Sequence, residues 1–287
     1  MKPAVLIFGY GFIGAAFAAE ARQAGYDILA TARASDKRDQ LAAQGIDAVD
    51  PADPEALAAA VSRTSGLLIT PAPDDGGCPA FAALSSLLID AEARWIAYLS
   101  TTGVYGDRDG GWVWEDSDLR PGSTEGRRRV LAEQQWQSLA GHLVNVFRLP
   151  GLYGPGRSVI ERLRDGTARR IHKPEHVFSR LHHDDCGTAL LASLLRQTRG
   201  VFNLCDDEPA PADQVLTYAA SLTGLPLPPE MAWDDPALSP VTRRFYADNK
   251  RVANARAKAV LGWRPRYPTY REGLSALWQA IQSGKSA

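Results

Sequence analysis

The stretch that decides the fold is residues 4–14, which read Ala-Val-Leu-Ile-Phe-Gly-Tyr-Gly-Phe-Ile-Gly. The first five residues are apolar and predict a buried strand over Ala4–Phe8. The three glycines that follow have the G-x-G-x-x-G spacing of a dinucleotide-binding turn. In such a turn Gly9 allows the sharp change of direction, Gly11 lets the backbone approach a pyrophosphate, and Gly14 lets the next helix pack against the strand.

A helix is expected to follow this turn over Ala15–Ala24. The helix N-terminus would offer free N–H groups and a partial positive charge to phosphates, so Phe12 and Ile13 join the three glycines as candidate cofactor contacts. The alternative is that the glycine-rich turn serves another ligand in an α/β protein.

Short apolar runs alternate with helical stretches through the first two thirds of the chain. Further strands are expected over Asp27–Thr31, Ala48–Val49, Gly66–Thr70, Trp95–Ser100 and Leu143–Arg148, and further helices over Lys37–Gln44, Glu55–Ser62, Phe81–Ala91 and Arg128–Leu139. This alternation predicts an α/β fold in which a doubly wound parallel sheet carries helices on both faces, as in a Rossmann domain.

Beyond Gly151 prolines become frequent and the apolar runs shorten. Strands are expected over Val177–Arg180 and Gly200–Leu204, and helices over Ser158–Arg164, Asp185–Leu195, Ala212–Thr223, Asn254–Val260 and Tyr270–Gln282. We expect residues 1–149 and 177–205 to form the dinucleotide-binding domain. Residues 150–176 and 206–287 should form a small substrate-binding lobe.

The end of the second strand indicates which nicotinamide cofactor binds. A site for NAD usually has Asp or Glu there, which accepts a hydrogen bond from the ribose 2′-hydroxyl. This chain has Ala32 in that position, followed by Arg33, whose planar guanidinium suits a 2′-phosphate. The sequence therefore favours NADP, with NAD as the alternative if Arg33 is only a surface residue.

Residues 99–106, which read Leu-Ser-Thr-Thr-Gly-Val-Tyr-Gly, resemble the fifth-strand segment of the extended short-chain dehydrogenase/reductases, the NAD-dependent epimerase/dehydratase family. Further segments that resemble this family, in the same order, are Arg148–Gly156, Arg180–Asp185, Val201–Leu204, Leu261–Pro265 and Glu272–Leu274. The resemblance covers nearly the whole chain. It implies the predicted fold, and it implies that Pro71, Ser100 and Pro150 lie at the cofactor.

The same resemblance implies a Ser/Thr, Tyr and Lys set that moves the proton accompanying hydride transfer. Thr101 falls at the Ser/Thr position, where it would orient the reacting oxygen. In the next helix Gly126 and Ala132 fit the family's register, but Glu125 stands at the tyrosine position and Arg129 at the lysine position. The chain therefore resembles an atypical subgroup without the catalytic tyrosine and lysine.

This replacement matters chemically, because an ordinary carboxylate is ionised at neutral pH and donates a proton poorly. Loss of a positioned acid–base group typically costs about 10²–10⁴ in rate. Arg129 could still hold a ribose or an acidic substrate, and Glu125 could act as an acid or base if it were desolvated. The simpler alternative is an (i, i+4) ion pair between Glu125 and Arg129.

Two other groups of residues are candidate sites. Residues 182–185 read His-His-Asp-Asp, but adjacent side chains face different ways, so we expect no metal there and expect Asp184 or Asp185 to cap a helix. Arginines are dense between Arg148 and Arg180, which would suit a phosphate or carboxylate substrate, or would simply form a solvated face.

Composition narrows the class of protein. The chain has 287 residues and a net charge of −1, so its charge gives no pull toward nucleic acid or an anionic membrane. Its three cysteines are far apart, which favours a reducing, cytoplasmic location. The glycine spacing argues against reading the apolar N-terminus as a signal peptide, and no other stretch is long enough to span a bilayer.

These observations lead to one expected function and one competing function. The expected function is an NAD(P)-binding oxidoreductase, epimerase or dehydratase-like enzyme that acts on a small polar, possibly nucleotide-linked substrate. The competing function is a non-catalytic NADP(H)-binding sensor or regulator. The helices at Phe81–Ala91 and Arg128–Leu139 could pair two copies of the chain, so both a monomer and a homodimer stay open.

Overall fold

A computed structural model describes residues 2–89, 92 and 94–284. Its centre is a seven-stranded sheet in the order β11-β7-β5-β4-β1-β2-β3, in which every neighbouring pair is parallel. The strands are β1 Ala4–Phe8, β2 Asp27–Thr31, β3 Asp47–Val49, β4 Gly66–Ile69, β5 Trp95–Thr101, β7 Leu143–Leu149 and β11 Gly200–Asn203. The predicted α/β, Rossmann-like fold is confirmed.

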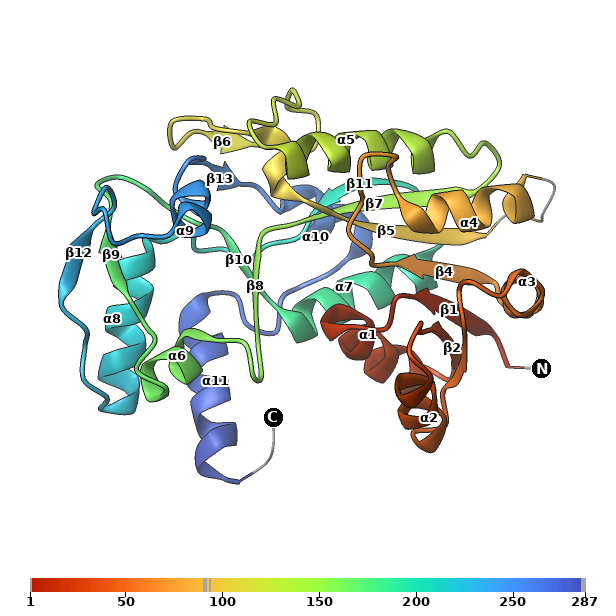
Figure 1. Cartoon of the computed structure of the whole chain (residues 1–287), viewed down its shortest axis with the longest axis horizontal. Coiled ribbons are helices and arrows are strands. Elements are labelled where there is room, and N and C mark those ends of the chain that lie inside the picture. The colour runs from red at the N-terminus through yellow and green to blue at the C-terminus, as the bar shows by residue number, and fades with distance from the viewer. Residues whose placement is uncertain (1, 90–91, 93, 285–287) are drawn as a thin grey trace.

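Helices cover both faces of this sheet (Figure 1). They are α1 Phe12–Gln23, α2 Ser35–Ala43, α3 Pro54–Ser62, α4 Pro79–Leu88, α5 Thr124–Gln137 and α7 His183–Arg196. On the face of α1 and α7, Phe17 stacks on Trp95 at a centroid distance of 5.9 Å. On the face of α4 and α5, Phe81 meets the edge of Trp136 at 5.3 Å. These packed rings, of which Phe81 is partly buried, stabilise the two halves of the core.

The later part of the chain adds further elements at one end of the sheet, on the left in Figure 1. They are β8 Gly151–Tyr153, α6 Val159–Arg164, β9 Arg170–His172, β10 Arg180–His182, α8 Ala212–Thr223, β12 Glu230–Ala232, α9 Pro240–Phe245 and α11 Tyr270–Gln282. A separate apolar cluster, which includes Ile160, Leu216 and Leu274, holds α6, α8 and α11 together. The exact domain boundaries stay a prediction.

Four small elements complete the fold. The strands β6 Trp112–Val113 and β13 Arg251–Val252 pair in parallel, and α10 Ala255–Leu261 packs near α7. A short 3₁₀ turn, η1, runs from Thr102 to Tyr105 after β5. No helix in the described residues combines the length and apolar character needed to cross a membrane.

Helix starts differ from the sequence-based expectation where a cap was not recognised. The helix α5 begins at Thr124, because the Ser123 hydroxyl accepts a hydrogen bond from the Gly126 N–H at 3.0 Å. The helix α7 begins at His183 and is capped by His182, whose ring nitrogen accepts from the Asp184 N–H at 3.3 Å. The expectation that Asp184 or Asp185 caps this helix is therefore wrong. The end of the expected helix Phe81–Ala91 lies outside the described residues.

Candidate functional site

The turn after β1 has a backbone that only glycine adopts comfortably. Gly9 has φ +87°, and a Cβ on it would lie 2.6 Å from the Thr70 side-chain oxygen. The Gly9 N–H donates to the Thr31 hydroxyl at 3.0 Å, and the Thr70 hydroxyl donates to the Gly9 carbonyl. The turn is thus held between the ends of β2 and β4.

The next two glycines of the motif have different surroundings. A Cβ on Gly11 would meet no atom within 4 Å, so this residue borders open space above the turn. A Cβ on Gly14 would lie 3.1 Å from the Ile7 side chain, so α1 packs closely on β1. No side chain caps α1, and the first N–H groups of a helix have no partner within it. The turn therefore fits a pyrophosphate on free backbone donors.

Phe12 and Ile13 open α1 beside this space. Ile13 is buried in the core, so only its backbone faces the turn. The Phe12 ring stacks on His183 at 4.7 Å, and the Arg157 guanidinium lies 5.6 Å from the same ring. This layer places residues of the second half of the chain directly against the start of α1.

The end of β2 presents positive charge. Arg33 is exposed, and Arg38 lies one turn into α2. The Arg38 guanidinium donates to the Ala32 carbonyl at 2.9 Å and to the Arg33 carbonyl at 2.6 Å, and it pairs with Asp50 at 3.3 Å. Sequence reasoning missed Arg38. The sequence signal for this second positive charge is an arginine in the first turn of the helix that follows β2.

The end of β5 carries Ser100 and Thr101 with their hydroxyls in different settings. Thr101 is partly exposed, and its hydroxyl oxygen accepts from the Gly103 N–H at 3.1 Å, which leaves the hydroxyl proton free to donate. Ser100 is buried, and its hydroxyl donates to the Glu133 carboxylate. The Ser100 side chain is therefore occupied, and only Thr101 offers a hydroxyl at this strand end.

A buried polar network lies behind these two residues. The Arg148 guanidinium pairs with Glu133 at 2.8 Å and donates to the Tyr105 hydroxyl at 2.9 Å. The Tyr105 hydroxyl in turn donates to the Asn203 side-chain oxygen at 2.7 Å. Burial raises the pKa of Tyr105, although Arg148 opposes the shift. Tyr105 therefore belongs to the framework of the sheet.

The residues at the tyrosine and lysine positions point to different partners. Glu125 is 65% exposed at its side chain and pairs with Arg244 of α9 at 3.4 Å. The Arg129 guanidinium donates to the Leu99 carbonyl at 2.6 Å and to the Tyr98 hydroxyl at 3.1 Å. The ion pair between Glu125 and Arg129, considered as one alternative, is therefore wrong. Glu125 is solvated, and Arg129 is held against β5.

The two prolines expected at the cofactor lie at strand ends. Pro71 follows β4, and its ring lies 3.1 Å from where a Cβ on Gly9 would stand. Pro150 lies between the end of β7 and the start of β8. Both prolines are partly exposed at the edge where the parallel strands end. Ligands bind at this edge in open α/β sheets.

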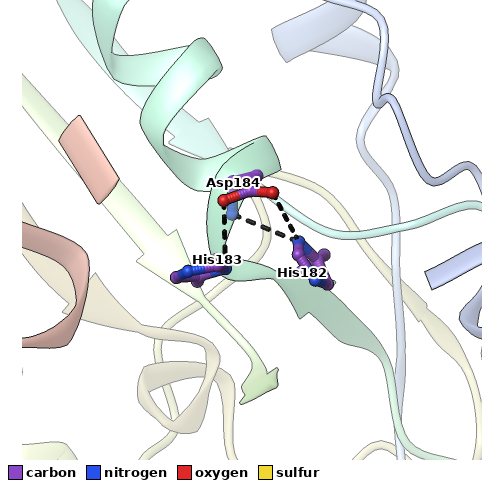
Figure 2. A group of neighbouring side chains, drawn as sticks. All are labelled: His182, His183 and Asp184. Carbon is purple, nitrogen blue, oxygen red and sulfur yellow. Dashed lines mark hydrogen bonds and ion pairs between the residues drawn. The ribbon is translucent and has the colours of Figure 1, made fainter. Parts of the chain in front are cut away.

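Figure 2 shows that His182, His183 and Asp184 converge. Their possible ligand atoms lie within 4.8 Å of one another, so the argument that adjacent residues must diverge is wrong. The reason is that His182 ends β10 while His183 begins α7. The Asp184 carboxylate pairs with His183 at 3.2 Å and with His182 at 3.6 Å, and burial lowers the pKa of His182 to about 4. These contacts lie at the start of α7, where the His182 ring caps the helix.

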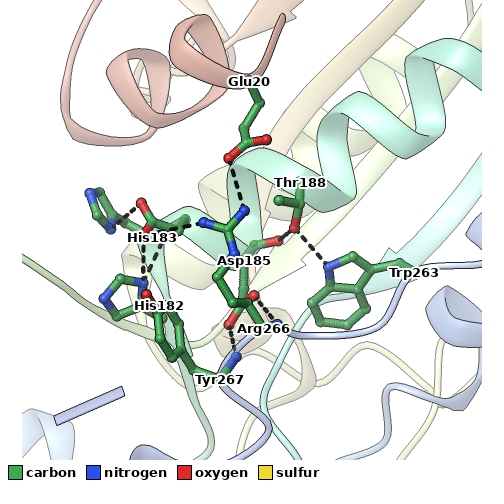
Figure 3. Close-up of polar contacts among 9 residues, drawn as sticks. Glu20, His182, His183, Asp185, Thr188, Trp263, Arg266 and Tyr267 are labelled. Carbon is green, nitrogen blue, oxygen red and sulfur yellow. Dashed lines mark hydrogen bonds and ion pairs between the residues drawn. The ribbon is translucent and has the colours of Figure 1, made fainter. Parts of the chain in front are cut away.

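The neighbouring Asp185 joins the C-terminal tail to the core, as Figure 3 shows. Its carboxylate accepts from the Arg266 N–H at 2.5 Å and from the Tyr267 N–H at 3.1 Å. The Trp263 indole N–H donates to Thr188 at 3.1 Å. Burial raises the pKa of Asp185 to about 6. The tail segment that resembled the family therefore has a structural role beside α7.

A cavity of about 790 Å³ opens next to this edge of the sheet, between β8, β10, α6, α8 and α11. Its wall begins at Gly151, directly after Pro150. Four of the arginines that sequence reasoning singled out line it: Arg157, Arg162, Arg169 and Arg180. A cavity of this size suits a small organic molecule.

Comparisons with known proteins agree with this architecture. None of the known protein-family models matches the chain. A conserved protein of unknown function from Silicibacter pomeroyi DSS is 43% identical over 100% of both chains, with a TM-score of 0.90. This chain belongs to the same family as that protein. The human epimerase family protein SDR39U1, solved with NADPH, shares 16% identity over 96% of this chain and 99% of its own, with a TM-score of 0.80.

One curated relative carries an activity in its name. The 3-diazoavenalumate denitrifying reductase from a Streptomyces species is 34% identical over 161 residues. The match spans 51% of this chain and about half the length of that relative, also 51%. Together, the comparisons show that the chain has the epimerase and short-chain dehydrogenase/reductase fold that its motifs resembled.

Proposed function

We propose that this chain, which shares a family with the Silicibacter protein and a fold with the NAD(P)-binding epimerases, is an NADP(H)-dependent reductase of a small organic molecule. The observation that carries the proposal is the open N-terminus of α1, with Gly11 at its edge and free N–H groups facing the space above it. Gly9 and Gly14 keep this turn in place.

The preference for NADP rests on the end of β2. Ala32 stands where a carboxylate would hold the ribose of NAD, the exposed Arg33 follows it, and Arg38 donates to the carbonyls of both residues. The 2′-phosphate of NADP would therefore meet positive charge, and no carboxylate would oppose it in the position that normally selects NAD. The NADPH bound to human SDR39U1 supports the same choice for this fold.

When bound, NADPH would supply a hydride. The chain's own contribution would be to place the substrate near Thr101, whose free hydroxyl proton can hydrogen-bond an electronegative atom. Arg129 would act indirectly, because its guanidinium is already bonded to Leu99 and Tyr98. We propose that Glu125 takes no part in proton transfer, because it is solvated and paired with Arg244.

A site without the tyrosine is best suited to reductions that do not leave an alkoxide in need of a strong acid. Displacement of dinitrogen from an aryl diazonium by hydride is one such reaction, because a C–H bond forms while the C–N bond breaks and N₂ departs with that electron pair. The name of the Streptomyces relative, a denitrifying reductase of a diazo compound, supports this class of chemistry. A cytoplasmic location stays our expectation, because Cys78, Cys186 and Cys205 are buried free thiols.

The test is turnover of NADPH, followed at 340 nm, with a panel of aldehydes, ketones, activated alkenes and diazo compounds. Consumption that depends on one of these compounds supports the reductase. NADPH binding without consumption across the panel would contradict it and favour the sensor. The engaged side chains of Arg129 and Glu125 are the observations that keep the sensor as the second candidate.

A further inference from the structure

The cavity beside Gly151 has walls that are mainly apolar and aromatic. Leu216 comes from α8, Leu274 from α11, and the rings of Phe178, Tyr246 and Tyr270 complete the lining. Phe178 and Tyr246 pack edge to face with ring centroids 5.2 Å apart, which fixes both rings. A flat or extended apolar group would be well accommodated here.

One cation, Arg180, is built into this apolar lining. In β10 it pairs in register with Gly151 of β8, and its Nη1 donates to the carbonyls of Phe178 at 2.8 Å and Ala210 at 2.9 Å. Two bonds from one nitrogen hold the guanidinium in a set orientation. The edge formed by Nε and Nη2 makes no hydrogen bond within the described residues, so two parallel donors are available to a planar anion.

The charge near Arg180 is poorly balanced. Asp206 is the acidic group whose charge acts on it most strongly, but the Asp206 side chain is 2% exposed and burial raises its pKa to about 8. Burial therefore favours the protonated, neutral form of this carboxyl and weakens it as a counter-charge for Arg180. Arg180 keeps its charge because a guanidinium does not lose its proton in proteins. A partly buried cation without a full counter-charge favours an anionic ligand.

The mouth of the cavity adds further positive charge. Arg157, Arg162 and Arg169 line it and are exposed. Two acidic residues also line it: the Glu161 carboxylate is engaged in the capping box with Ser158 at the start of α6, and Asp165 is exposed, so three arginines face one carboxylate outside the capping box. Exposed arginines would attract an anion toward the opening, and Arg180 would bind it inside.

We propose that this cavity binds an organic carboxylate with an aromatic or similarly flat apolar body, and that the carboxylate pairs with the free edge of Arg180. This proposal rests on the proposed function, because the bound substrate would receive its hydride from NADPH. Arg180 lies beside Gly151, and Gly151 follows Pro150, which we expect at the cofactor. A carboxylate on Arg180 and a reducible group near the cofactor would therefore belong to one small molecule.

A nucleotide-linked substrate, expected as a possibility from the sequence, fits this lining less well. A diphosphate carries two or more charges that need several fixed donors. Among the described residues that line the cavity, Arg180 is held by two hydrogen bonds, whereas Arg157, Arg162 and Arg169 are exposed, and Arg169 makes one longer bond to the Ala237 carbonyl at 3.5 Å. The aromatic and aliphatic walls contribute more binding free energy to an apolar group than to a sugar.

The test compares two ligands of nearly equal shape by calorimetry on the full chain with NADPH present: 3-phenylpropionate and its neutral amide, 3-phenylpropionamide. The acid should bind at least tenfold more tightly than the amide. Arg180→Gln should remove this preference, whereas Arg164→Gln, which changes an exposed arginine of α6 outside the cavity lining, should keep it. Thermal unfolding checks that both variants fold.

Equal binding of acid and amide to the wild-type chain would overturn the proposal, and this comparison does not depend on any variant. Tighter binding of UDP-glucose than of the acid, with competition between them, would also overturn it in favour of a nucleotide-linked ligand. NADPH affinity is measured in the same samples. If the chain binds the acid but does not bind NADPH, the proposed reductase is contradicted and the assignment of the cavity stays intact.

Discussion

The carboxylate of Glu133 and the guanidinium of Arg148 form a buried ion pair at 2.8 Å, directly behind the strand end that carries Thr101. Glu133 also accepts the hydroxyl of Ser100, which lies opposite Arg148 in the register of β5 and β7. The pair therefore joins α5, β5 and β7 at the point where a substrate would meet the cofactor.

Glu133→Gln should destabilise the chain, because it leaves the Arg148 charge buried without its partner. Breaking one side of a buried pair costs about 3–5 kcal/mol. Chemical denaturation measures the loss. The matched control is Asp47→Asn, which breaks the exposed Asp47–Arg63 pair and should change stability by about 0–1 kcal/mol. Similar losses in the two variants would contradict a structural role for the buried pair.

Two alanine substitutions in the glycine turn should separate folding from binding. Gly9→Ala should lower both stability and NADPH affinity, because Gly9 has a positive φ and its Cβ would collide with Thr70. Gly11→Ala should leave the melting temperature nearly unchanged, because Gly11 has extended φ and ψ and open space around it.

The added methyl group on Gly11 would instead stand where a pyrophosphate approaches, so NADPH affinity should fall at least tenfold. Thermal unfolding and fluorescence titration of both variants measure the two effects. Unchanged NADPH affinity in the folded Gly11→Ala variant would place the cofactor elsewhere.

Glu125→Gln should change NADPH turnover by less than about threefold. Its side chain is 65% exposed, and the ion pair with Arg244 is of the surface kind that contributes about 0–1 kcal/mol. Removal of a working acid–base group would cost about 10²–10⁴ in rate. The comparison is Thr101→Val, which should reduce turnover while NADPH affinity stays the same. A large loss in the Glu125→Gln variant would give the glutamate a catalytic role.

The buried Asp206 should make stability depend on pH. Burial raises its pKa from an ordinary value near 4 to about 8, so the folded chain holds this proton more tightly than the unfolded chain. The proton held by Asp206 contributes fully to the free energy of unfolding below about pH 4, and this contribution is lost as the pH rises toward 8.

Asp206→Asn should therefore gain stability relative to wild type between about pH 4 and 8, by a few kcal/mol at most, and the difference should then level off. Denaturation at several pH values measures this. A stability difference that does not change with pH would mean that Asp206 is ionised alike in both states.

The parts of the molecule that depend on local sequence could be predicted. The glycine turn follows from the spacing of Gly9, Gly11 and Gly14, and the parallel sheet with helices on both faces follows from the alternation of apolar runs and helical stretches. The start of α5 was misplaced because a serine cap is a weak signal in a polar stretch.

Contacts between distant segments could not be predicted. Glu125 pairs with Arg244, 119 residues later, and Arg180 lies beside Gly151 only because β8 and β10 pair. His182 and His183 converge because a strand ends between them and a helix begins, a change of geometry that spacing alone does not reveal.

The most direct test of the central claim is the titration of the chain with NADPH and NADH, followed by cofactor fluorescence, in the wild type, in Arg33→Ala and in the control Arg164→Ala. The account predicts that NADPH binds at least tenfold more tightly than NADH. It also predicts that Arg33→Ala removes most of this difference while Arg164→Ala keeps it. Tighter binding of NADH by the wild type, or a preference untouched by Arg33→Ala, would contradict it.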